Sequence, residues 1–69
     1  MDYAFTYAVV RIGAEWKVVC ARKAMGHFGD REDALVAASA LAAQAARAGR
    51  PTEVIVQSET GELKTVWRS

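Results

Sequence analysis

The chain has 69 residues, one cysteine, one histidine and a formal net charge of +1. A chain of this length forms one small domain of thin stability, and such domains usually add disulfides, a metal ion or association between copies. One cysteine and one histidine cannot form a disulfide or a structural zinc site within a single chain. Association between copies is therefore the remaining source of added stability. The near-balanced charge argues against a strongly basic surface for nucleic acid.

Residues 3–12 and 15–22 alternate between apolar and small or polar side chains, which predicts two strands. Gly13-Ala14 between them suits a two-residue type II′ turn, and such a turn fixes the register of a hairpin. Counting from this turn gives one face the large side chains that a core requires. These are Phe5, Tyr7, Val9, Trp16, Val18 and Cys20.

Residues 31–48 predict an alanine-rich amphipathic helix. Asp30 can cap its first amides, and Gly49 can end it. Residues 23–29 read as the loop into this helix, with two glycines as turn signals. Because one side of the helix carries mostly methyl groups, we expect it to approach a sheet closely and the strands to supply the bulky side chains.

Residues 53–58 and 62–68 predict a second hairpin, with Gly61 at a left-handed turn position. The expected fold is a single α+β domain over residues 1–69 with the order ββαββ. One helix lies on one face of a mainly antiparallel four-stranded sheet. Which strand of the first hairpin meets which strand of the second stays open.

The sequence offers little that indicates catalysis. Nucleophilic catalysis needs a base beside the nucleophile, and Cys20 with His27 is the only such pairing. The predicted register turns Cys20 inward, where a thiol behaves as a small apolar group. The carboxylates fall at hairpin turns and at the helix start rather than in a cluster. We therefore expect no enzymatic activity, no cofactor and no metal.

Two surfaces are candidates for contact with another molecule. The second face of the first hairpin mixes aliphatic and charged residues, and the outward side of the helix carries a few apolar ones. These surfaces are either solvated or covered by a partner. The candidate interface residues are Val10, Ile12, Lys17, Val19, Val36, Ala40 and Ala43. They predict a protein-interaction module that forms a homodimer or binds an unidentified protein.

Nucleic-acid binding is the alternative. Arg22, Lys23, Lys17, Lys64 and Arg68 could form a basic strip beside the second sheet face. A stacking platform also needs exposed aromatic side chains, and the alternation turns the aromatic residues inward. The chain shows no signal-peptide pattern and no apolar run of the roughly 20 residues that span a membrane, so we expect a cytoplasmic protein without membrane contact.

The order of the segments resembles a small bacterial ββαββ family catalogued as domain of unknown function 2188. The resemblance rests on WKVVCAR at 16–22, Phe28 before the helix, EDALVAASALAAQAARAG at 32–49 and EVIVQSETGEL at 53–63. It spans nearly the whole chain. It implies the same fold, and it brings no established activity and no catalytic residues.

A second resemblance involves the hairpin with TYAVVR and the segment GHFGDREDALVAASALAAQA at 26–45. Together they are similar to the amino-terminal half of HicB-type antitoxins. There, a hairpin precedes a helix in a degenerate ribonuclease H-like fold. This resemblance implies a toxin as partner, and DNA binding as an oligomer.

Overall fold

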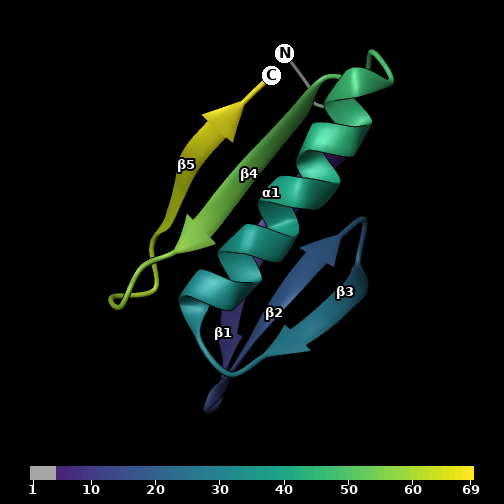
Figure 1. Ribbon diagram of the computed structural model, residues 1–69. Coiled ribbons are helices and arrows are strands. Elements are labelled where there is room, and N and C mark those ends of the chain that lie inside the picture. The colour runs from purple at the N-terminus through teal and green to yellow at the C-terminus, as the bar shows by residue number, and fades with distance from the viewer. Residues whose placement is uncertain (1–4) are drawn as a thin grey trace.

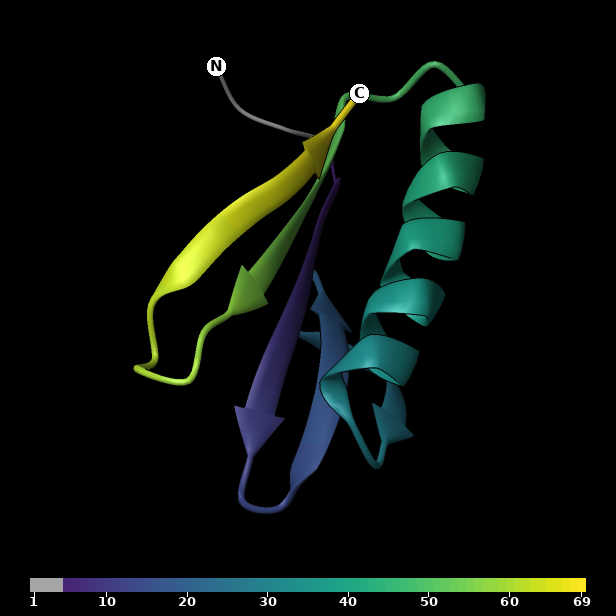
Figure 2. The same ribbon diagram turned by 60° about the vertical axis from the view of Figure 1, so that its left-hand side comes forward.

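The computed structural model describes residues 5–69, which form one helix on one face of a five-stranded sheet (Figures 1 and 2). The α+β class is therefore confirmed. Among these residues, no helical segment has the length and apolar character needed to cross a bilayer. The elements are β1 (Phe5–Ile12), β2 (Glu15–Cys20), β3 (Lys23–Phe28), α1 (Arg31–Arg47), β4 (Thr52–Gln57) and β5 (Leu63–Arg68).

The strands lie in the order β3-β2-β1-β4-β5, and β1 pairs with β4 in parallel while the other pairs are antiparallel. The expectation of a mainly antiparallel four-stranded sheet was wrong in two respects. Residues 23–28 form a strand rather than a loop, and the β1–β4 contact makes the sheet mixed. The first two residues of the predicted strand 3–12 lie outside the described residues.

The turn between β2 and β3 explains why this strand escaped prediction. Ala21 and Arg22 have φ angles of 52° and 68°, so both central residues are left-handed, as a type I′ turn requires. That turn normally contains asparagine and glycine, because other residues pay a steric penalty there. A hairpin without these residues gives no turn signal in the sequence, so Lys23–Phe28 resembled a loop.

This turn allows a test. Replacing Ala21 with asparagine and Arg22 with glycine is expected to raise the free energy of unfolding by about 1 kcal/mol, because the left-handed strain is relieved. Urea denaturation measures the change. Ala14→Gly is the matched control, since Ala14 follows Gly13 in the first turn and is not left-handed. Equal effects of the two replacements would contradict the assigned turn.

The core confirms that the helix face is thin. Ala34, Ala38 and Ala42 are fully buried on α1. The strands supply larger groups beneath them, and the largest fully buried ones are Val9, Val18, Val54 and Thr52. The aromatic side chains Phe5, Trp16 and Phe28 are only partly buried at the margin of this cluster. A helix this close to the sheet has valines beneath its centre and these three rings at the rim, while Tyr7 is buried in the core.

Both predicted ends of the helix are confirmed. The Asp30 carboxylate accepts a hydrogen bond from the Asp33 N–H at 2.8 Å, which satisfies one of the free amides at the start. At the other end Gly49 has a φ of 81° and donates its N–H to the Ala46 carbonyl at 3.0 Å. Arg50 donates to Ala45 at 3.2 Å, which completes a Schellman motif.

Candidate functional site

Side chains alternate between the two faces of a sheet. Within residues 5–69 the helix covers one of these faces and leaves the other open (Figure 2). The predicted register of the first hairpin is confirmed, with Val9 opposite Val18 and both turned toward α1. Their neighbours therefore point to the opposite side, which we call the open face. There Ala8 lies between Val19 on β2 and Ile55 on β4.

Aliphatic side chains form the centre of the open face. We call Ala8, Val10, Val19 and Ile55 the aliphatic strip. All four are only half-exposed, because they lie side by side on the three central strands β2, β1 and β4. Ile12 extends the strip toward the first turn and is 51% exposed. Contiguous apolar surface on a small domain marks a contact surface more often than single exposed residues do.

Charged groups border the strip on opposite sides. Glu53 lies beyond one end of the strip, where its carboxylate accepts a hydrogen bond from the Thr6 hydroxyl at 3.0 Å and lies 3.9 Å from Nε of Arg68. Lys17 lies beside Val10 near the other end, and it is half-exposed. The Thr6 hydrogen bond fixes the Glu53 carboxylate in place on a face that no other element in the described part of the chain covers.

The structure divides the predicted interface residues into two groups. Val10, Ile12, Lys17 and Val19 lie together on the open face. The other three lie on the outward side of α1, across the molecule, and they do not join the first group. These are Val36, which is 68% exposed, Ala40 and Ala43.

Sequence reasoning did not place Ile55 and Glu53 beside the first hairpin on the open face. Both lie on β4, and they reach the first hairpin only through the parallel contact with β1. The alternation placed Ile55 away from Val54 and Val56, but nothing in the sequence identified its neighbours across the sheet. A pattern that is local to one hairpin cannot show a pairing between segments more than forty residues apart.

The two edges of the sheet are less suited to association. Each edge strand contains a bulge against its inner neighbour, at Met25 in β3 and at Val66 in β5. Bulges and edge lysines are the usual devices that prevent one edge from pairing with another. Lys23 and Lys64 lie on these two strands. The open face is therefore the better candidate for contact.

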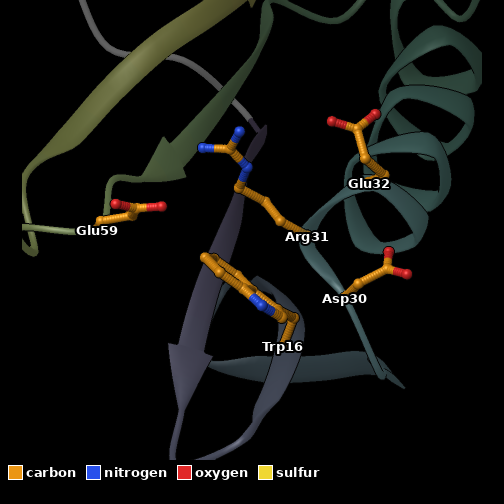
Figure 3. Close-up of a pocket in the computed structure, with 5 residues that line it drawn as sticks. All are labelled: Trp16, Asp30, Arg31, Glu32 and Glu59. Atoms are coloured by element: carbon orange, nitrogen blue, oxygen red, sulfur yellow. The ribbon is translucent and has the colours of Figure 1, made fainter.

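A pocket of about 290 Å³ lies at the start of α1. Figure 3 shows Trp16 of β2 on one side, Asp30, Arg31 and Glu32 of the helix start on another, and Glu59 of the β4–β5 turn across from them. The Asp30 carboxylate is already engaged as the helix cap. The sequence could not predict this pocket, because its wall depends on where the second hairpin lies.

The pairing of Cys20 with His27 does not form. Cys20 is buried on the helix side of the sheet. His27 is paired with Lys17 and exposed, with its Nδ1 3.8 Å from a Glu15 carboxylate oxygen. The pKa of the Tyr7 hydroxyl is raised, first because the side chain is buried and second because Cys20 lies beside it. Within residues 5–69, no group of three or more histidine, cysteine or acidic side chains could hold a metal ion.

The structure also disperses the basic residues of the predicted strip. Lys17 and Arg68 lie on the open face, whereas Lys64 is paired with Val56 and so turns toward the helix side of the sheet. Arg22 lies in the β2–β3 turn, next to Lys23. Among the described residues, the aromatic side chains of the strands lie on the helix side, so the open face lacks a stacking surface.

No family model, curated protein or solved structure matches this chain. The resemblances to the ββαββ family and to HicB-type antitoxins therefore stay predictions.

Proposed function

We propose that this chain is a non-catalytic protein-interaction module of the cytoplasm, and that it forms a homodimer through its open face. The observation that carries the proposal is the aliphatic strip, four contiguous and half-exposed residues on a sheet face that no element of residues 5–69 covers. A small domain gains stability from covering such a strip. A second copy brings an identical strip.

The size of the open face supports this proposal. Five strands about 4.8 Å apart and about 20 Å long give a face of roughly 500 Å² in projection. Two such faces, with the relief of their side chains, approach the lower end of specific interfaces, at about 1,200 Å² of total buried surface. Packing of the two sheets would place both α1 helices on the outside, in four layers.

The outward side of the helix is the weaker surface. Val36 is the only large aliphatic side chain exposed on α1, Ala40 and Ala43 beside it add only methyl groups, and Glu32 and Ser39 are exposed one turn away on either side. Isolated apolar residues of this kind are normal on a protein surface. The nucleic-acid alternative lacks a supporting observation, because the basic residues are dispersed and the open face is aliphatic.

Sedimentation equilibrium over a concentration series, at low and at moderate salt, tests the proposal. We expect a dimer that persists into the low micromolar range at both salt concentrations, since the contact is mainly apolar. A chain that stays monomeric at millimolar concentration would refute the proposal. Higher oligomers would show that a second surface, such as the helix side or an edge strand, also takes part.

A further inference from the structure

The charged residues of the open face have an arrangement that a second copy would match. Lys17 lies one strand and two residues from Ala8 in one direction, through its pairing with Val10. Glu53 lies one strand and two residues from Ala8 in the opposite direction, through its pairing with Thr6. With about 4.8 Å between strands and 3.3 Å per residue, each lies roughly 8 Å from Ala8 on a single diagonal.

These two groups cannot pair within one chain, because the diagonal separates them by roughly 16 Å, which exceeds the Debye length at physiological salt. Among residues 5–69, Lys17 forms no ion pair or hydrogen bond, although its side chain is half-buried on the open face. The Glu53 side chain is only 18% exposed. Lys17 is thus partly desolvated without forming an ion pair among residues 5–69. The Glu53 carboxylate already has Arg68 Nε at 3.9 Å, and it has acceptor sites left for a second cation from outside.

We infer that the partner in the proposed dimer lies across the open face, related by a two-fold axis at Ala8, so that Lys17 of each copy pairs with Glu53 of the other. This axis lies in the plane between the two sheets and is perpendicular to the diagonal from Lys17 to Glu53. A half-turn about it exchanges the two ends of the diagonal. It therefore places Lys17 over the partner's Glu53 and Glu53 over the partner's Lys17. This inference rests on the proposed function and specifies the partner and its orientation.

The same operation matches other residues of the face. It brings Val10 over the partner's Ile55, so that aliphatic side chains meet. It also brings Arg68, which lies one strand beyond Glu53 on β5, close to the partner's Glu15. The small Ala8 lies at the axis, where two copies of the same side chain must approach each other. The diagonal lies about 36° from the strand direction, so the strands of the two sheets then cross at roughly 70°. This angle is closer to the orthogonal than to the aligned arrangement of packed sheets.

Charge reversal tests this orientation. Lys17→Glu places two carboxylates together at both ends of the dimer, and Glu53→Lys places two ammonium groups together. We expect each single variant to self-associate at least about tenfold more weakly than the original chain at low salt, because close charge pairs contribute strongly across an interface. Sedimentation equilibrium gives the dissociation constants, and circular dichroism verifies the fold of each variant.

Mixing the two variants is the decisive step. A heterodimer of Lys17→Glu with Glu53→Lys restores opposite charges at both ends, so we expect the mixture to associate within about threefold of the original affinity. Rescue cannot arise within a chain, since the two positions are far apart. Lys64→Glu on β5 is the matched control, and it should leave association unchanged because Lys64 faces the helix side.

The outcomes separate the two proposals. If the original chain is monomeric, the proposed dimer fails. If it dimerises but the single variants dimerise equally well, or if their mixture stays monomeric, the dimer stands and this orientation is wrong. Should Glu53→Lys fail to fold, Glu53→Gln can replace it, since an amide oxygen can still accept the Thr6 hydrogen bond. The Lys17→Glu/Glu53→Gln variant should then associate more tightly than Lys17→Glu, and an equal or weaker association overturns the inference.

Discussion

Replacing Ala38 with leucine is expected to lower the free energy of unfolding by about 1 to 3 kcal/mol. Ala38 is fully buried at the middle of α1, above a cluster in which Val9, Val18 and Val54 are also fully buried. A side chain of three more carbons has no space there, so the helix must move away from the sheet or the valines must leave their preferred rotamers. In a small domain this is a large part of the total stability.

Ala40→Leu is the matched control, because Ala40 lies on the same helix and is exposed. Leucine and alanine are both good helix formers, so this variant should remain within about 0.5 kcal/mol of the original chain. Urea denaturation of both variants measures the difference. Similar stabilities of the two variants would show that the helix does not lie close to the sheet at Ala38.

Replacing Ala8 with glutamate is expected to weaken dimerisation by about 100-fold or more, because it buries two unpaired carboxylates at the centre of the interface. Ala8 is half-exposed on the open face and lies outside the cluster of buried core residues. The isolated chain should therefore still fold. Sedimentation equilibrium measures the dissociation constant, and circular dichroism measures the helix content.

Ala40→Glu separates the two candidate surfaces, because it places the same charge on the outward side of α1. We expect this variant to dimerise as the original chain does. If Ala40→Glu abolishes the dimer while Ala8→Glu leaves it intact, the interface is the helix side and the open face is solvated.

The parts of the fold that sequence could predict are those with a local physical signal. Gly13 marks a turn that requires a positive φ, and its φ of 63° together with the register of β1 and β2 confirms that reading. Asp30 and Gly49 mark the helix ends in the same way. The register of the β1–β2 hairpin also placed four residues on the open face. These are Val10, Ile12, Lys17 and Val19.

The parts that escaped prediction depend on strain or on contacts between distant segments. The β2–β3 hairpin has a left-handed turn built from Ala21 and Arg22, residues that do not normally mark such turns. The parallel pairing of β1 with β4 connects segments separated by β2, β3 and α1. It alone brings Glu53 and Ile55 to the site, so neither the charge diagonal nor the full strip could be predicted.

The most direct test of the central claim is an isotope-filtered NMR experiment on a mixture of labelled and unlabelled chains, which detects contacts between copies only. The open-face dimer predicts intermolecular signals from the methyl groups of Ala8, Val10, Val19 and Ile55. Signals from Val36, Ala40 and Ala43 instead, or no intermolecular signal at millimolar concentration, would contradict it.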